Sequence, residues 1–115
     1  MATRLNETAL RHARSLVRDG KVVRDERDDW SEHAPSADDE NRFIEKEGWA
    51  AFRHWHLGID DDENRETKGA SSFPYGDLSK VHRCAVISLE SRAGQYGHDE
   101  IRDAARKLLE LIDAE

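Results

Sequence analysis

The fold is decided by residues 97–114, which read GHDEIRDAARKLLELIDA. The apolar residues of this stretch recur every three or four positions, so a helix would carry them on one side. They are Ile101, Ala104, Ala105, Leu108, Leu109 and Ile112. Asp99 and Glu100 stand where negative charge favours the first turn of a helix. The pattern predicts an amphipathic helix that buries its apolar stripe against the rest of the chain.

The segment before it, residues 78–93, has apolar residues all around a helical wheel, which is typical of a buried helix. The run 84–89 also fits a core strand, because periodicity alone does not separate the two for a short run. The residues that follow, ESRA, continue a helix well and favour that interpretation. A short turn at 94–97 then predicts an antiparallel helical pair over 78–115.

The N-terminal part, residues 1–20, predicts another helix. Asn6 is a suitable N-cap, Glu7 fits the first turn, and Gly20 is a suitable stop. Its apolar residues, Leu5, Ala9, Ala13, Leu16 and Val17, share one side. Residues 21–35 show no periodic apolar face and are expected to be irregular, with Val22 and Val23 as a possible short extended piece and Trp30 as the anchor.

The middle of the chain, residues 36–57, predicts a helix followed by an aromatic segment. Ser36 and Asp39 have the spacing of a capping box, and Gly48 either ends or bends the helix. Residues 49–57 fit a helix to about Arg53, although the alternation at their end also suits a strand. Residues 58–77 are expected to form a second long loop, held to the core by Phe73 and Tyr75.

Together these segments predict one domain over residues 1–115. Its class is mostly α: a compact bundle of three to four helices with two long loops and minor short strands. The prediction rests on the low content of proline and glycine, two and seven residues in 115.

The composition excludes several classes of protein. The chain carries a net charge of −7 with 37% charged residues, and it has no apolar run long enough to cross a membrane. It has one cysteine, so a disulfide scaffold is excluded. No apolar signal segment opens the sequence, which predicts a cytoplasmic protein. The acidic balance argues against nucleic-acid binding, although a weak contact through the basic N-terminal helix, at Arg14 and Arg18, is one alternative.

Two histidines suggest a metal site. His54 and His56 would project to one side of an extended segment, and Asp60 follows closely enough to be a third ligand. The motif lacks the fixed spacing of known zinc motifs, so a polar edge beside Trp55 explains the same residues. No cofactor is predicted.

A second group of residues suggests a binding surface. Aromatic side chains gather in the middle of the chain, and they either form the core that fastens the loops or line a recognition surface. Basic residues close to them would complete a mixed pocket. The candidate binding residues are Trp49, Trp55, Phe73, Tyr75, His82 and Arg83.

Four short strings carry a resemblance to known proteins. They are WHLGID at 55–60, FPYGD at 73–77, VHR at 81–83 and RAGQ at 92–95. The chain, from about residue 28 onward, resembles a family of small uncharacterised proteins of high-GC bacteria. The resemblance implies a bacterial, intracellular, stand-alone domain. It implies no activity, and so no catalytic residue.

These observations favour a non-catalytic binding or interaction module with a protein partner or a second copy of itself. The competing class is a small enzyme. It would use a metal held by His54 and His56, or His82 as an acid–base group beside Arg83.

Overall fold

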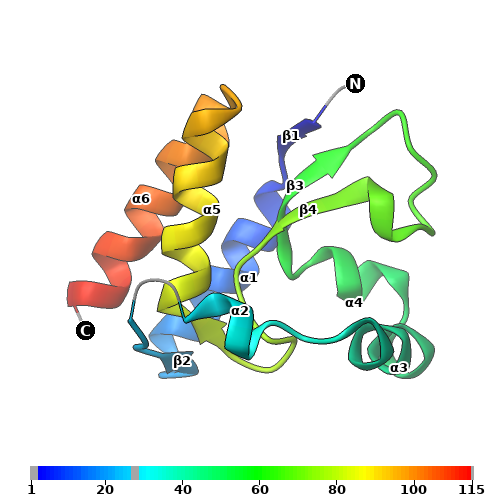
Figure 1. Ribbon diagram of the computed structural model, residues 1–115, viewed down its shortest axis with the longest axis horizontal. Helices are drawn as coiled ribbons and strands as arrows, with labels where there is room; N and C mark the ends of the chain where they lie inside the picture. The colour runs from blue at the N-terminus through cyan, green and yellow to red at the C-terminus, as the bar shows by residue number, and fades with distance from the viewer. Residues whose placement is uncertain (1–2, 27–28, 115) are drawn as a thin grey trace.

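The structure is a computed structural model that describes residues 3–26 and 29–114 (Figure 1). Within those residues the helices are α1 (Glu7–Arg18), α2 (Trp30–His33), α3 (Ala37–Glu47), α4 (Trp49–Arg53), α5 (Arg83–Gln95) and α6 (Asp99–Ala114). The strands are β1 (Thr3–Leu5), β2 (Val22–Val23), β3 (His56–Asp60), β4 (Ser71–Pro74) and β5 (Val81–His82), with a 3₁₀ turn at Lys68–Ala70.

The predicted C-terminal helical pair is confirmed. Helices α5 and α6 lie side by side along one flank of the molecule (Figure 1). Leu89 of α5 and Leu108 of α6 are both buried in the core. Residues 84–89 are helical, which settles the choice between helix and core strand. Helix α5 starts at Arg83 and not near residue 78, because Val81 and His82 pair with another strand.

A three-stranded antiparallel sheet packs against these helices. Its order is β1-β3-β4, with Arg4 opposite Ile59 and Gly58 opposite Ser72. A side chain at position 58 would place its Cβ only 2.4 Å from the Ser72 hydroxyl, so glycine allows the two strands to approach. The sheet corrects two predictions: residues 58–77 are not one long loop, and the described residues form six helices with two small sheets and not a bundle of three to four helices.

A second, smaller sheet confirms the short extended piece expected at Val22 and Val23, whereas helix α2 corrects the prediction that the rest of 21–35 is irregular. Strand β2 runs parallel to β5, with Val22 opposite Val81 and Val23 opposite His82. Short β-branched residues pack well in such a pair. The pairing brings residues 24–26 beside the start of α5, although the two segments are far apart in the sequence.

The helix-capping signals are confirmed. The Asn6 side chain accepts a hydrogen bond from the Ala9 amide at the start of α1. Ser36 and Asp39 form a reciprocal capping box at the start of α3, with donor–acceptor distances of 3.1 and 3.2 Å. No helix in the described part of the chain is both long enough and apolar enough to span a membrane.

Replacing Ser36 with alanine is expected to destabilise the protein by about 1 kcal/mol, because the Asp39 amide loses its acceptor at the helix start. Urea denaturation followed by circular dichroism measures the change. Ser15→Ala is the matched control, since Ser15 is an exposed serine inside α1. Equal stability of the Ser36 variant and the wild type would contradict a stabilising capping box.

Candidate functional site

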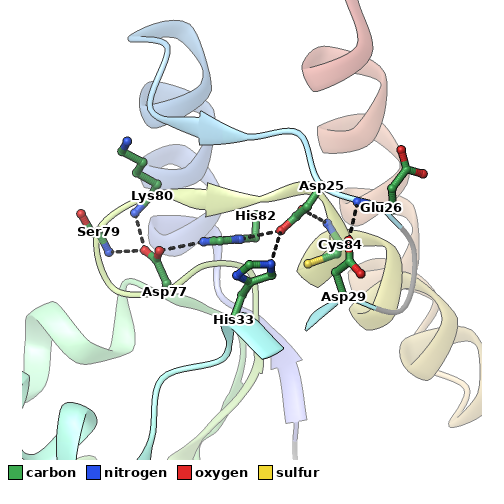
Figure 2. Close-up of polar contacts among 9 residues, drawn as sticks. All are labelled: Asp25, Glu26, Asp29, His33, Asp77, Ser79, Lys80, His82 and Cys84. Carbon is green, nitrogen blue, oxygen red and sulfur yellow. Dashed lines mark hydrogen bonds and ion pairs between the residues drawn. The ribbon is translucent and has the colours of Figure 1, made fainter. Parts of the chain in front are cut away.

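The imidazole of His82 lies between two carboxylates. His82 Nδ1 is 2.7 Å from Asp25 Oδ2, and His82 Nε2 is 2.7 Å from Asp77 Oδ2 (Figure 2). His82 closes β5, Asp25 follows β2, and Asp77 follows β4, so three separate segments meet at one ring. The His82 side chain is only 4% exposed.

The ring is a cation in this arrangement. An ionised carboxylate only accepts hydrogen bonds, so both ring nitrogens of His82 must donate. Burial lowers the pKa of His82, but the hydrogen bonds to Asp25 and Asp77 outweigh burial and raise it overall. Burial raises the pKa of the Asp25 carboxyl, but the hydrogen bonds that it accepts from Cys84 and His82 lower this pKa overall.

Asp25 also binds the start of α5. Its second oxygen accepts a hydrogen bond of 2.8 Å from the Cys84 backbone amide. The residue before the helix, His82, offers no side-chain cap of its own. Asp25 therefore satisfies a backbone donor that would otherwise lack a partner at the helix start.

Asp77 is held from the other side. Its Oδ1 accepts the backbone amides of Ser79 and Lys80 at 2.9 and 2.7 Å. Burial raises the pKa of the Asp77 carboxyl, but the hydrogen bonds it accepts, first that of His82, lower it overall. Leu78 has a φ of 70°, a conformation that costs a non-glycine residue free energy. Asp77 thus caps its own loop.

Cys84 is the fourth side chain of the cluster, which also contains His82, Asp25 and Asp77. Cys84 Sγ, a ring nitrogen of His82 and a carboxylate oxygen of Asp25 all lie within 4.8 Å of one another. Among the residues that the structure describes, this is the group of three that could hold a metal ion. Burial, and then the nearby Asp25 carboxylate, raise the pKa of the Cys84 thiol to about 12, so it is protonated at neutral pH.

Two aromatic side chains cover the cluster. The rings of His33 and His82 stack with centroids 5.1 Å apart, and the Trp30 ring is 5.8 Å from that of His82. His33 Nε2 lies 3.9 Å from Asp25 Oδ2 (Figure 2). A groove of about 700 Å³ runs between α2 and α5, and Trp30 and Cys84 both line it.

The aromatic residues predicted to bind a partner are largely core residues. Trp55, Phe73 and Tyr75 are 5%, 8% and 0% exposed, and the Trp55 and Tyr75 rings stack at 5.3 Å. Trp49 is half-buried, and its ring forms a T-shaped contact with that of Phe52.

Of the two predicted basic binding residues, His82 belongs to the cluster and Arg83 does not. Arg83 turns outward to Asp113, with Nε and Oδ1 2.9 Å apart.

The Tyr75 hydroxyl makes two further polar contacts. It donates to the His54 carbonyl at 2.7 Å and lies 2.7 Å from His12 Nδ1. Its one proton is committed to the carbonyl, so His12 Nδ1 must be the donor in the second bond. Burial raises the pKa of the Tyr75 hydroxyl, which keeps it protonated in this role.

The structure does not gather His54, His56 and Asp60 into a metal site. His56 is buried, and its Nδ1 donates to the Phe52 carbonyl at 2.9 Å. The Asp60 carboxylate accepts the Asp62 amide in a local turn. In residues 3–26 and 29–114, the group of potential ligands lies instead around His82.

The sequence pattern did not identify Asp25, Asp77, His33 or Cys84 as site residues. Asp25 stands in a charged run, and nothing in that run links it to residue 82. The one local signal was the presence of β-branched residues before both site residues. Val22 and Val23 stand shortly before Asp25, and Val81 stands directly before His82.

The chemistry of this cluster must be derived from its own residues. Its residues come from three separate segments of the chain, so no short sequence motif predicts the cluster. No family model, curated protein or solved structure matches the chain.

Proposed function

We propose that this chain is a metal-binding module that holds one zinc-like divalent transition metal through Asp25, His82 and Cys84. The observation that carries the proposal is the convergence of carboxylate oxygen, imidazole nitrogen and thiol sulfur within 4.8 Å. Zinc takes all three donor types. A thiolate and an imidazole disfavour magnesium and calcium, which prefer oxygen ligands.

Asp77 supports the proposal from outside the ligand set. A histidine that binds a metal usually donates its other ring N–H to a carboxylate, which fixes the tautomer and the ring orientation. Asp77 occupies that position on Nε2, leaving Nδ1 facing Asp25. The Asp77 carboxylate is itself held by two backbone amides, so the whole array is preorganised.

The charges of the cluster also suit a divalent ion. Two carboxylates, the imidazolium and the neutral thiol sum to −1. Metal binding requires a neutral imidazole and a thiolate, so two protons leave as two positive charges arrive. The cluster stays at −1, and binding adds no net charge to a buried site.

Two of the three ligand atoms need only a small adjustment. Asp25 Oδ2 and His82 Nδ1 are at hydrogen-bond distance, 2.7 Å, whereas two ligands on a tetrahedral zinc ion are about 3.3 Å apart. For this pair of atoms, moving apart by roughly half an ångström converts a hydrogen bond into the spacing of two zinc ligands. His33 is close enough to serve as a fourth ligand after a ring movement, and the groove beside Cys84 provides access.

The same geometry weakens the alternative of acid–base catalysis by His82. A general base must have a nitrogen within reach of its substrate. Both nitrogens of His82 are committed to carboxylates, and Arg83 is paired with Asp113. Metal binding uses the two carboxylates, whereas acid–base catalysis would require one of them to leave.

The test is metal titration of protein that has been stripped with a chelator and kept reduced. We expect one Zn²⁺ per chain and, with Co²⁺, the thiolate-to-cobalt absorption band that only a cysteine ligand produces. Cys84→Ser and His82→Gln should each weaken Co²⁺ binding by at least about tenfold, and Asp77→Asn by about tenfold without removing a ligand.

His54→Gln is the matched control, because it removes the imidazole that the sequence favoured for a metal site while leaving the cluster intact. Circular dichroism verifies that each variant is folded. Binding weaker than about 100 μM, a cobalt spectrum without the thiolate band, or full binding by Cys84→Ser would each overturn the proposal. A loss of binding in His54→Gln alone would place the metal at the site predicted from the sequence.

A further inference from the structure

A second pocket shares no lining residue with the cluster and is lined by arginines. Its volume is about 290 Å³, and the side chains around it come from β1, α1, α4 and the loop after β3. The arginines are Arg4, Arg11, Arg53 and Arg65, joined by His54. Four guanidinium groups at one pocket are unexpected in a chain with a net charge of −7.

Two of these arginines have no acidic partner among the described residues. Arg11 donates to the Thr8 hydroxyl at 3.3 Å, and Arg53 donates to the Arg65 carbonyl at 2.7 Å. Within the described ranges neither guanidinium lies at ion-pair distance from a carboxylate, whereas Arg4 is paired with Asp61. The neutral acceptors leave the positive charge of Arg11 and Arg53 uncompensated.

The arginines that line the pocket outnumber the acidic residues that line it. Asp61 lies 3.9 Å from Arg65 and is shared with Arg4. Glu7 also lines the pocket, as its one carboxylate. The lining residues thus carry four guanidinium groups and one carboxylate, and Asp61 is shared between two of the arginines.

The backbone around the pocket is held in place by Asn6. Its Nδ2 donates to the Arg53 carbonyl at 3.1 Å, while its Oδ1 accepts the Ala9 amide. Asn6 is 8% exposed and so connects the start of α1 to the end of α4 from inside the protein. The segments that carry Arg11 and Arg53 are therefore fixed relative to each other before any ligand arrives.

We propose that this pocket binds the phosphate group of a small phosphorylated molecule, with Arg11 and Arg53 as its main contacts. A guanidinium presents a planar fork of N–H donors that matches phosphate oxygens in pairs. The volume is at the lower end of the range for small-molecule sites, which suits a phosphate with a short organic group. Thr8 adds a hydroxyl at the same wall.

The test uses glycerol 3-phosphate and inorganic phosphate as probes, with glycerol as the uncharged control. Nitrogen–proton NMR spectra of the arginine side chains report which guanidinium groups respond, and calorimetry gives the dissociation constant. We expect saturable shifts at Arg11 and Arg53 with both phosphates and none with glycerol. The double variant Arg11→Gln/Arg53→Gln should bind at least about tenfold more weakly.

Arg14→Gln/Arg18→Gln is the matched control, because it removes the same charge from α1 away from the pocket. We expect its affinity to stay within about twofold of the wild type. Equal weakening by both double variants would indicate diffuse attraction along α1, as in a nucleic-acid contact, and would overturn the pocket. No saturation below about 10 mM would overturn it as well. Both variants change exposed or half-buried side chains, so folding is preserved and is verified by circular dichroism.

Discussion

Gly76→Ala is expected to destabilise the protein by about 3 kcal/mol, because the new methyl group has no room. A Cβ at position 76 would lie 2.3 Å from the Lys80 carbonyl oxygen and 2.8 Å from the Trp55 ring. The first of these atoms belongs to the backbone, and it accepts the Asp77 amide at 3.1 Å. Relief of the clash therefore requires the loop itself to move.

Thermal denaturation should show a melting temperature lower by about 10 °C for a chain of this length. Gly69→Ala is the matched control, because the nearest atom to its Cβ would be the Thr67 hydroxyl at 4.0 Å. We expect the control to remain close to the wild type. Similar stability of the two alanine variants would show that the loop adapts to a side chain at position 76.

The Gly76→Ala substitution should also affect the proposed metal site. Gly76 precedes Asp77, and the Asp77 carboxylate orients the His82 ring. A displaced loop should therefore weaken Co²⁺ binding even though no ligand is changed. Gly69→Ala, which lies outside this loop, should leave that binding unchanged.

Acid is expected to destabilise the protein through His56. Burial lowers the pKa of His56 to about 4, and the bond to the Phe52 carbonyl only partly offsets this effect. The unfolded chain has the ordinary pKa of 6.5 and takes up a proton first as the pH falls. Stability from the neutral imidazole is therefore complete above pH 6.5 and is lost as the pH falls towards 4.

The expected loss is about 2 kcal/mol by about pH 5 and about 3 kcal/mol by about pH 4. His12 shifts stability in the same direction, because burial also lowers its pKa, and His82 shifts it in the opposite direction. Urea denaturation of the wild type and His56→Gln across this pH range isolates the contribution of position 56. Glutamine keeps a donor for the Phe52 carbonyl and does not titrate, so its stability should fall less with acid. Parallel pH profiles for the two proteins would contradict the assignment.

Helix positions were predictable where the signals were local. The Asn6 cap, the Ser36 capping box and the apolar stripe of 97–114 each involve residues within a few turns of one another. Their hydrogen bonds and packing faces depend on local backbone geometry, so a sequence pattern is sufficient. The same holds for the end of α3 at Gly48, where the φ of 92° suits glycine.

The strands were less predictable, because strand partners are distant in sequence. The alternation at residues 55–57 suggested an extended segment, and β3 begins there. Its partners, β1 and β4, could not be inferred from that alternation, since pairing depends on which edges the helices leave accessible. The sequence left open whether the aromatic residues form the core or a recognition surface, because their location around β3 and β4 depends on the strand pairing.

The amino-acid sequence alone was sufficient for the helical character, the caps, the acidic surface and the buried stripe of α6, because each depends on composition or short spacing. The candidate site depended on tertiary structure. Asp25 and Cys84 are 59 positions apart in the sequence. The parallel pairing of β2 with β5 brings them together, so that the Cys84 backbone amide donates a hydrogen bond to the Asp25 carboxylate. Each of these residues has an ordinary local environment in the sequence. Their chemistry arises only when packing removes water and places His82 between two fixed carboxylates.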